Sequence, residues 1–339
     1  MKIAIIGPVI TDKYFGGVAT FDEALAEGFQ ELGHQVRIFS SQDGQAANRQ
    51  LDIRQMKKSE IGGTVNKEKF DLTIASLQYG TVLKKIHTGK KIYFLHGFFN
   101  IQSYGIAKTL AATALTKQMT GYADCIIANS NFTAAVNQRI WNTSVDGVAH
   151  LGVDDEFIEK VTPIAERSPE ELKRILFVGR LALSKHVERV IQAAALLESS
   201  SYELIIAGDG PERKNLEKLA KDIKVNARFL GRVEHDRVSN LYKKCGTFIS
   251  LCESESYGLT YAEALVSGCK IICPVTGGQV EFLMDYSDRV SFVNVLSIES
   301  IADGIRKCLN IGNLSVDDAI VHEFRYTETA ERIIQISDR

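Results

Sequence analysis

Short apolar runs alternate with longer amphipathic segments along most of this 339-residue chain. Apolar runs of this kind are typical of strands buried on both faces, whereas the amphipathic segments have helical spacing. Such alternation predicts a parallel sheet with helices on both faces. In the first half the expected strands are Ile3–Ile6, Val36–Phe39, Leu72–Ala75, Ile92–Leu95, Cys125–Ala128 and Val145–His150, and the expected helices are Gly17–Leu32, Gly105–Gln118 and Phe132–Gln138.

A polar stretch from Asp154 to Glu171 interrupts this pattern and is predicted to be a linker, because it contains Pro163 and Pro169. The alternation then begins again. The expected strands of the second half are Ile175–Val178, Leu204–Ala207, Arg228–Leu230, Phe248–Leu251, Ile271–Cys273 and Ser291–Val293. The chain is long enough for two domains with separate cores. We therefore predict two doubly wound α/β domains facing a central cleft, at residues 1–155 and 171–320.

Composition places the chain among ordinary globular proteins. Hydrophobic residues make up 45% and charged residues 24%, and the net charge is −2 with a pI near 6.4. Without a basic excess the chain is not expected to bind nucleic acid. The six cysteines lack the spacing of metal ligands and are expected to be buried thiols in a reducing compartment. They are Cys125, Cys245, Cys252, Cys269, Cys273 and Cys308. We expect a cytoplasmic protein.

Membrane-spanning segments are not expected in this sequence. The apolar run within Met1–Pro8 is too short for a signal peptide, and no small-residue cleavage site follows it. No run approaches the roughly 18 apolar residues that a spanning helix needs. The lysine pairs Lys84-Lys85 and Lys90-Lys91 could face anionic lipid, although such pairs are more often solubilising residues. Peripheral contact with the inner face of a membrane is therefore left open.

The segment from Glu255 to Glu263 carries the strongest functional signal. It reads Glu-Ser-Tyr-Gly-Leu-Thr-Tyr-Ala-Glu and joins a short buried strand to an apolar helix. The first helical amides, near Gly258, Leu259 and Thr260, would be unpaired donors at the positive end of the helix dipole, which suits a diphosphate. Two carboxylates beside a phosphate are favourable only if they accept hydrogen bonds from neutral hydroxyls, such as those of a sugar and a ribose.

Residues that follow the other strands are the next candidates, because ligands of open parallel sheets bind beyond the carboxyl ends of the strands. Gly16 and Gly17 begin the first helix and would let a diphosphate approach the backbone. Their loop has neither a dinucleotide fingerprint nor a P-loop, which disfavours nicotinamide and ATP. His96 ends a buried strand and would face the cleft, whereas Ser130, beside Asn129, is more simply a helix cap.

Two cations of the second half, Arg180 and Lys185, follow the strand Ile175–Val178. Cations at the carboxyl edge of a sheet can neutralise a leaving diphosphate. Asp209, in the sequence Gly208-Asp-Gly-Pro211, is more simply a turn former than a ligand.

The spacing of Glu255 and Glu263 resembles the E-x7-E signature of retaining glycosyltransferase family 4, whose members have the two-domain GT-B fold. Several other matches occur in the order of that family along nearly the whole chain, and ordered matches are stronger evidence than any single motif. They are Gly16-Gly17, His96-Gly97, Leu151–Asp154, Phe177–Arg180 with Lys185, Ala207–Pro211, and Gly277-Gly278 with Glu281.

This resemblance implies roles for the site residues. Glu255 would hold hydroxyls of the donor sugar and Glu263 those of the ribose, while Arg180 and Lys185 would contact the donor phosphates. His96 would contact the donor sugar. The turn Leu230–Val233, with Arg232 and Val233, resembles the place where backbone groups meet the nucleotide base. One departure is His186, since the family usually has glycine after the lysine. The segment 321–339 resembles the family's last helix, which crosses back to the first domain.

The function implied is transfer of a hexose or N-acetylhexosamine from a nucleotide-diphosphate sugar, with UDP favoured on family frequency, to the hydroxyl of a glycan, lipid-linked or protein acceptor. Retention of anomeric configuration is expected, without a metal ion and with no cofactor beyond the nucleotide-sugar co-substrate. Two alternatives stay open: a UDP-sugar 2-epimerase of GT-B fold, which needs no acceptor, and a non-catalytic partner subunit. The acceptor loops, such as Ser40–Gly63, carry no interpretable motif.

Overall fold

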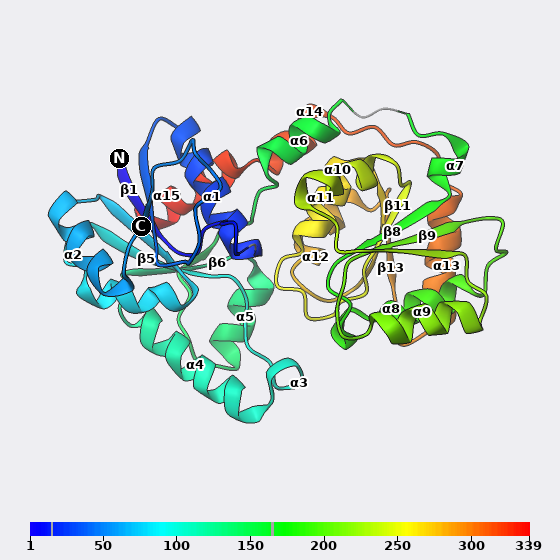
Figure 1. Ribbon diagram of the computed structural model, residues 1–339, viewed down its shortest axis with the longest axis horizontal. Coiled ribbons are helices and arrows are strands. Elements are labelled where there is room, and N and C mark those ends of the chain that lie inside the picture. The colour runs from blue at the N-terminus through cyan, green and yellow to red at the C-terminus, as the bar shows by residue number, and fades with distance from the viewer. Residues whose placement is uncertain (15, 164–165) are drawn as a thin grey trace. The chain divides into compact units, whose positions relative to one another are not determined.

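The computed structural model describes residues 1–14, 16–163 and 166–339, with the side chains of residues 102, 103, 235 and 236 also outside the description. The chain forms two compact units (Figure 1). Unit 1 comprises Met1–Asp154 together with Arg325–Arg339, and unit 2 comprises Asp155–Phe324. The sequence predicts two domains at residues 1–155 and 171–320 and a returning helix at 321–339, whereas in the structure unit 2 begins at Asp155 and ends at Phe324.

A seven-stranded sheet forms the centre of unit 1. Its strands are β1 (Lys2–Ile6), β2 (Gln35–Ser40), β3 (Ile53–Gln55), β4 (Leu72–Ser76), β5 (Lys90–Leu95), β6 (Cys125–Ala128) and β7 (Gly147–Val148). They lie in the order β3-β2-β1-β4-β5-β6-β7, and every neighbouring pair is parallel. Strand β4 is buried along its whole length, which explains why the sequence shows continuous apolar runs and no alternation of polar and apolar residues.

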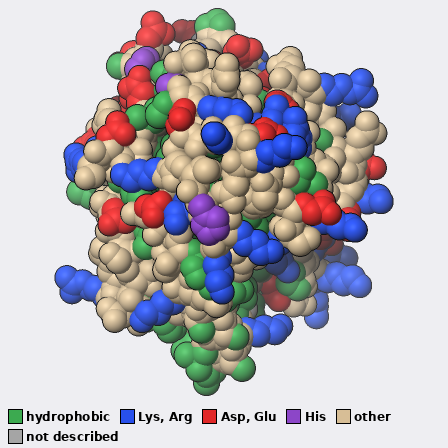
Figure 2. All heavy atoms as spheres, turned by 90° about the vertical axis from the view of Figure 1, so that its left-hand side faces the viewer, with side chains coloured by type: hydrophobic (Ala, Val, Ile, Leu, Met, Phe, Trp, Pro, Cys, Tyr) green, Lys and Arg blue, Asp and Glu red, His purple; other side chains and the backbone are tan. Residues whose placement is uncertain are grey.

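Helices lie on both faces of this sheet (Figure 1). They are α1 (Gly17–Glu31), α2 (Lys58–Glu68), α3 (Ile101–Tyr104), α4 (Ile106–Thr120), α5 (Asn131–Arg139), α15 (Tyr326–Ser337) and a 3-10 segment at Leu77–Lys85. Lysines and arginines are scattered over the face shown in Figure 2, while hydrophobic side chains gather at its lower tip, at the height of α3 and α4 in Figure 1.

Unit 2 repeats this architecture with six strands. They are β8 (Arg174–Val178), β9 (Glu203–Ala207), β10 (Ala227–Gly231), β11 (Thr247–Ile249), β12 (Lys270–Pro274) and β13 (Val290–Val293). Their order is β10-β9-β8-β11-β12-β13, again with parallel neighbours. Both sheets therefore grow first to one side of their first strand and then to the other. The prediction of two doubly wound parallel sheets is confirmed.

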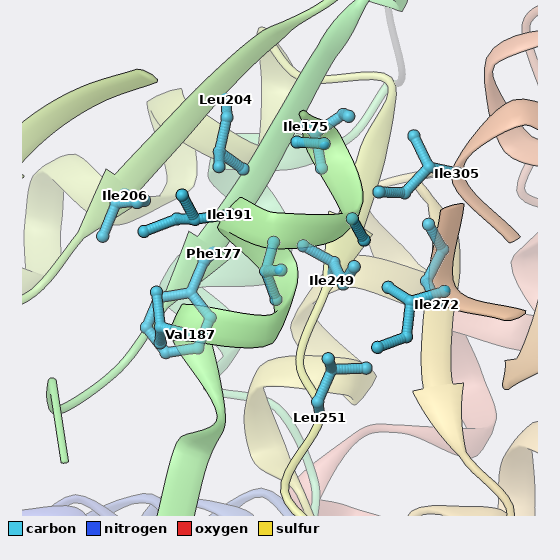
Figure 3. Packing of buried hydrophobic residues seen from close by; sticks show 14 of the residues in the cluster. Ile175, Phe177, Val187, Ile191, Leu204, Ile206, Ile249, Leu251, Ile272 and Ile305 are labelled. Carbon is cyan, nitrogen blue, oxygen red and sulfur yellow. The ribbon is translucent and has the colours of Figure 1, made fainter. Parts of the chain in front are cut away.

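The core of unit 2 forms where helices press on this sheet (Figure 3). Phe177 of β8 and Ile206 of β9 lie with Val187 and Ile191 of α8 in one fully buried cluster. Burying one such side chain contributes about 1.5–3 kcal/mol. The helices of unit 2 are α6 (Asp155–Val161), α7 (Pro169–Leu172), α8 (Val187–Ala194), α9 (Arg213–Asp222), α10 (His235–Lys243), α11 (Leu259–Val266), α12 (Val280–Leu283), α13 (Ile298–Leu309) and α14 (Asp318–Glu323), with 3-10 turns at Leu183–Lys185 and Met284–Tyr286.

The last helix, α15, packs in unit 1 against α1 (Figure 1). The approach is close because Gly28 of α1 has no side chain: a Cβ there would lie 2.7 Å from the backbone of Tyr326. Thr329 adds a hydrogen bond from its hydroxyl to the carbonyl oxygen of His150, at 2.8 Å. The C-terminal helix is thus a built-in part of unit 1.

Two predicted loops are partly regular structure. The stretch Asp154–Glu171, predicted to be a linker, contains α6 and the start of α7, because Phe157, Ile158 and Val161 supply α6 with a buried apolar face. The stretch Ser40–Gly63 contains β3 and the start of α2. Strand β3 escaped prediction because it is a short edge strand with two exposed residues.

Among the described residues, no helix is long and apolar enough to span a membrane.

The Gly28 contact can be tested by adding one methyl group. We expect Gly28→Ala to lower the free energy of unfolding of unit 1 by about 1–3 kcal/mol, because backbone atoms of α15 must move. Gly63→Ala is the matched control: it lies in α2 with nothing within 4 Å of its Cβ position and should stabilise by about 0.5–1 kcal/mol. Urea unfolding followed by fluorescence of Trp141, the only tryptophan, reports on this unit. Equal effects of the two substitutions would contradict the close contact.

Candidate functional site

The candidate site of unit 2 lies where its strand order reverses, between β8 and β11. Ligands of open parallel sheets bind at such switch points, beyond the carboxyl ends of the strands. The loops after β8, β9 and β10 stack closely there. The Gly179 amide donates to the carbonyl oxygen of Ala207 at 3.0 Å, and a Cβ on Gly208 would lie 1.8 Å from the carbonyl oxygen of Gly179. Glycine is required at position 208 because two backbones touch.

An ion pair joins the two loops of the switch point. Lys185 follows β8 and Glu255 follows β11, and Lys185 Nζ lies 2.7 Å from Glu255 Oε2. Burial alone would lower the pKa of the lysine, but Glu255 and Cys252 outweigh it, so that the pKa is raised. Lys185 is therefore a cation held at the carboxyl edge of the sheet, as predicted from the sequence.

Helix α11 begins beside this ion pair. Its cap, Gly258, has a left-handed backbone with φ 97°, and a Cβ there would lie 2.7 Å from Tyr261 and 3.3 Å from Glu255. The first intrahelical bonds come from the amides of Tyr261 and Ala262, both to the Gly258 carbonyl. The amides of Leu259 and Thr260 come before these first intrahelical hydrogen bonds and lie at the positive end of the helix dipole.

The second carboxylate of the signature, Glu263, lies within α11 and is half-buried. Tyr242 of α10 packs beneath it: the tyrosine hydroxyl donates to the carbonyl oxygen of Thr260 at 3.1 Å. Burial, and then the carboxylate of Glu263, raise the pKa of Tyr242 well above its usual value. Tyr242 is thus a fixed hydroxyl donor that holds this turn of α11, a contact the sequence did not reveal.

The remaining predicted residues of unit 2 lie along the same edge. Arg180 is exposed after Gly179, and Arg232 is exposed after β10 with half-buried Val233 beside it. Asp209 accepts a hydrogen bond from the Gly210 amide at 2.7 Å and pairs with Arg213 at 3.1 Å, which fits the turn-forming role.

His186 occupies the position where the resembled family usually has glycine, and its backbone is left-handed with φ 51°. This conformation costs a non-glycine residue roughly 1–2 kcal/mol. The imidazole Nδ1 lies 3.4 Å from Glu188, and Nε2 lies 3.9 Å from Glu253. Contacts with these two carboxylates partly offset the backbone strain. His186 therefore has the left-handed backbone typical of glycine, although it departs from the family pattern in its side chain.

Unit 1 has its own switch point, between β1 and β4. Gly16 caps α1 with an extended backbone, and α1 begins at Gly17. A Cβ at Gly17 would meet no atom within 4 Å, so packing within the protein does not require glycine there. Open space in front of the first turn of α1 is compatible with the predicted approach of a diphosphate.

His96, after β5, belongs to a buried polar network at this edge. Its Nε2 lies 3.0 Å from Ser76 Oγ, and that hydroxyl donates to Asp22 Oδ1 at 2.7 Å. The ring packs against Phe21 and Phe94, with centroids 4.7 and 4.9 Å away. Burial lowers the pKa of His96 to about 3, so the imidazole is neutral at physiological pH. The neutral ring can donate one hydrogen bond and accept another, but it supplies no charge.

Three buried polar residues at this edge escaped the sequence analysis: Asp22, Glu23 and Ser76. Burial raises the pKa of Asp22 well above its usual value, while the hydrogen bond from Ser76 lowers it. Glu23, next along α1, accepts a hydrogen bond from the Ile10 amide at 2.6 Å, and burial raises its pKa to about 7. The available signal was Asp22-Glu23 within the apolar stripe of α1, where carboxylates are costly unless they have partners.

Asn129 and Ser130 support this edge from the side of β6. Ser130 caps α5, because its Oγ accepts from the Thr133 amide at 2.9 Å. Asn129 donates to the carbonyl oxygen of His96 at 2.9 Å and so anchors the turn after β5.

The structure thus brings the predicted residues together in two sets, one within each unit. Among the described residues, no group of three or more His, Cys, Asp or Glu side chains is arranged to hold a metal ion.

Comparison with known proteins finds similarity to glycosyltransferases, and the matching family model lies within unit 2. Residues 160–318 match the family model of glycosyl transferases group 1. A GDP-mannose-dependent alpha-mannosyltransferase from Mycolicibacterium smegmatis is 30% identical over 190 residues, which cover 54% of this chain and 47% of that protein. The matched segments span only 24–57% of the lengths of the curated relatives.

Solved structures match the whole chain at low identity. A glycosyltransferase from Rickettsia africae has a TM-score of 0.76 at 18% identity and covers 99% of this chain and 98% of its own. HepE from Anabaena, in complex with UDP, has a TM-score of 0.71 at 16% identity and covers 100% and 98%. Together with the two parallel sheets, these likenesses show that the chain has the GT-B fold, as predicted.

Glu23 makes the stability of unit 1 depend on pH. The unfolded chain releases this proton near pH 4.5, whereas the folded chain holds it to about pH 7, so the free energy of unfolding falls as pH rises through this window. We expect Glu23→Gln to match the wild type at pH 4.5 and to exceed it by up to about 2 kcal/mol at pH 8. Urea unfolding monitored by Trp141 fluorescence measures this difference. A difference independent of pH would contradict it.

The strain at His186 gives a second prediction. We expect His186→Gly to raise the free energy of unfolding of unit 2 by about 0.5–1 kcal/mol, because glycine adopts a positive φ without strain. Denaturant unfolding followed by circular dichroism gives the value. His87→Gly, at an exposed histidine outside the left-handed region, is the control and should not stabilise. A loss of stability in His186→Gly would mean that the contacts with Glu188 and Glu253 outweigh the strain.

Proposed function

We propose that this chain is a retaining glycosyltransferase of family 4, which moves a hexose or N-acetylhexosamine from a nucleotide-diphosphate sugar to an acceptor hydroxyl. One observation carries the proposal: the Lys185–Glu255 ion pair stands beside the first turn of α11 at the switch point of unit 2. A cation, a carboxylate and helical amides in one place match the phosphate and the sugar hydroxyls of such a donor. The match of residues 160–318 to group 1 glycosyl transferases supports the same conclusion.

Each part of the donor has a proposed partner. The diphosphate binds the amides of Leu259 and Thr260 at the start of α11, with Arg180 and Lys185 as counter-charges. Lys185 then exchanges part of its contact with Glu255 for phosphate oxygens, which frees the carboxylate to accept hydrogen bonds from sugar hydroxyls.

The nucleoside contacts the other side of the site. Glu263 accepts hydrogen bonds from the ribose hydroxyls, and the base lies against the backbone at Arg232 and Val233. In unit 1, Gly16 and Gly17 allow the diphosphate to approach α1, and the neutral His96 contacts the donor sugar.

The chemistry follows from these charges. The bond between the anomeric carbon and the diphosphate oxygen breaks, and the acceptor oxygen bonds to the same face of that carbon. The acceptor proton passes to the leaving phosphate oxygen, so no side chain is needed as a general base. Arg180, Lys185 and the amides of α11 stabilise the charge that builds on the leaving group, and they do so without a metal ion.

UDP is the proposed nucleotide of the donor. The structural neighbour HepE was solved in complex with UDP, which supports this choice. The mannosyltransferase relative is named as GDP-mannose-dependent, so GDP is the specific competitor. We propose that the acceptor is a surface glycan or glycoconjugate and that transfer occurs in the cytoplasm or at the inner face of its membrane.

The donor site is tested by calorimetric titration of UDP, GDP, ADP and their common sugar conjugates in the presence of EDTA. We expect one nucleotide to bind selectively, with an affinity that falls about 10- to 100-fold in Lys185→Ala, because a hydrogen bond to a charged group contributes about 1.5–3 kcal/mol. Glu263→Ala should lower the affinity for both the nucleotide and its sugar conjugate. Lys218→Ala, at an exposed lysine of α9, is the matched control and should bind as the wild type does.

Binding of none of these compounds would refute the donor site. If the donor sugar is converted without any acceptor, the epimerase alternative replaces transfer. With an acceptor, NMR of the anomeric carbon in the product must show the configuration of the donor, since inversion would contradict the proposed mechanism.

A further inference from the structure

Helix α4 of unit 1 has its polar and apolar residues on unexpected sides. Its buried positions are Thr109, Thr116, Met119 and Thr120. The threonine hydroxyls bond to backbone carbonyls, for example Thr109 Oγ1 to Asn100 O at 3.1 Å. The aliphatic side chains point outward instead: Ile106 is 65% exposed and Leu110 is 57% exposed. A helix that served only to cover the sheet would have the opposite distribution.

These side chains belong to a larger apolar face, defined here as Ile101, Tyr104, Ile106, Leu110 and Leu115. The face contains five of the thirteen exposed large hydrophobic side chains found among the described residues, within 15 consecutive positions. Hydrophobic side chains gather at the corresponding lower tip in Figure 2. Contiguous exposed apolar surface of this kind marks a site of interaction with a protein or a membrane.

The charge around the apolar face selects between these partners. No aspartate or glutamate occurs between Asp71 and Asp124, although the whole chain carries a net charge of −2. The same 52 positions contain six lysines: Lys84, Lys85, Lys90, Lys91, Lys108 and Lys117. Lys108 and Lys117 lie exposed on α4 itself, and the 3-10 segment that carries Lys84 and Lys85 packs against α4. An apolar surface bordered by cations, with no acid nearby in sequence, complements an anionic lipid surface.

A cavity of about 360 Å³ opens behind this face, and its volume lies within the usual range for ligand pockets. Its wall is mainly apolar and includes Tyr104 and Leu115 of the face itself. It also contains two buried donors that have no hydrogen-bond partner among the described residues, Trp141 Nε1 and Thr113 Oγ1. Unpaired buried donors are costly, and the oxygen of an ester carbonyl would satisfy them.

We propose that the apolar face docks unit 1 on an anionic bilayer and that the cavity behind it takes the acyl chain of one lipid. The apolar side chains enter the boundary between headgroups and acyl chains, and the lysines contact the anionic headgroups. The ester of the bound lipid accepts hydrogen bonds from Trp141 and Thr113. His96 also lines the cavity, so a lipid there reaches the edge at which the sugar is placed, a consequence that rests on the proposed function.

Flotation with vesicles tests the docking without any donor or turnover, so its failure is separate from a failure of the transferase proposal. The wild type should bind vesicles that contain phosphatidylglycerol at least tenfold better than pure phosphatidylcholine vesicles. The double variant Ile106→Ser, Leu110→Ser should lose tenfold or more of this binding. Both side chains are exposed, so the fold is retained. Leu296→Ser, at a leucine of unit 2 that is 75% exposed, is the matched control and should bind as the wild type does.

The role of the lysines is tested by charge reversal, with a matched pair of lysines in unit 2 as the control. Lys108→Glu with Lys117→Glu should abolish the preference for anionic vesicles, whereas Lys214→Glu with Lys218→Glu, on α9 of unit 2, should preserve it. Absence of vesicle binding, or binding that none of the α4 variants reduces, would overturn the proposal. If sedimentation without lipid shows a dimer that Leu110→Ser dissociates, the face belongs to a second copy of the chain and the membrane assignment is wrong.

The cavity has a direct reporter in Trp141, the single tryptophan of the chain. Vesicles whose lipids carry bromine on the acyl chains should quench the fluorescence of Trp141. The substitution Leu115→Trp reduces the space at the cavity wall and should therefore weaken the quenching of Trp141. The variant signal is read relative to a Leu115→Trp, Trp141→Phe protein, which reports the new tryptophan alone. Vesicle binding without quenching of Trp141 would overturn the assignment of the acyl chain to the cavity.

Discussion

Parallel pairing of every strand is the constraint on which the rest of this structure depends. Because all strands of a sheet run the same way, all of their carboxyl ends meet at one edge, and the loops that follow them are forced together. Lys185 and Glu255 are 70 residues apart in sequence, yet they form an ion pair because β8 and β11 are neighbours. The same constraint brings Ser76 to His96 through β4 and β5 in unit 1. The chemistry of each unit is therefore set by its topology.

The sequence predicted the sheets well because their physical signal is local and strong. A strand such as β4 is buried on both faces, and a continuous apolar run reports that burial directly. The start of α11 was also predictable, since Gly258 is followed by apolar residues with helical spacing and takes the left-handed backbone that only glycine adopts without strain. Strand β3 was missed because a short edge strand has a weak pattern, and α6 was missed because its three buried apolar residues lie within a seven-residue helix in an otherwise polar stretch.

Side-chain partnerships were the harder part of the site. The carboxylate of Asp22 has its partner in Ser76, 54 residues away, and no sequence spacing reveals which strand will lie beside α1. Tyr242 of α10 supports α11 from 18 residues away in sequence, and this pairing likewise has no sequence signature. Helix α4 departs from the usual pattern, because Thr109, Thr116 and Thr120 are buried whereas the side chains of Leu110 and Leu115 are exposed. Hydrophobic periodicity alone therefore does not predict which face of α4 is buried.

The return of α15 to unit 1 has a consequence for synthesis on the ribosome. Unit 1 cannot be completed until residues 155–324 have been made, because its last helix follows them in sequence. At roughly 5–20 residues per second, translation of this insertion takes about 10 to 30 s. During that time α1 lacks the helix that packs against its Gly28 side. The nascent first sheet therefore emerges with α1 uncovered, and α15 can pack against α1 only after residues 325–339 have also left the exit tunnel.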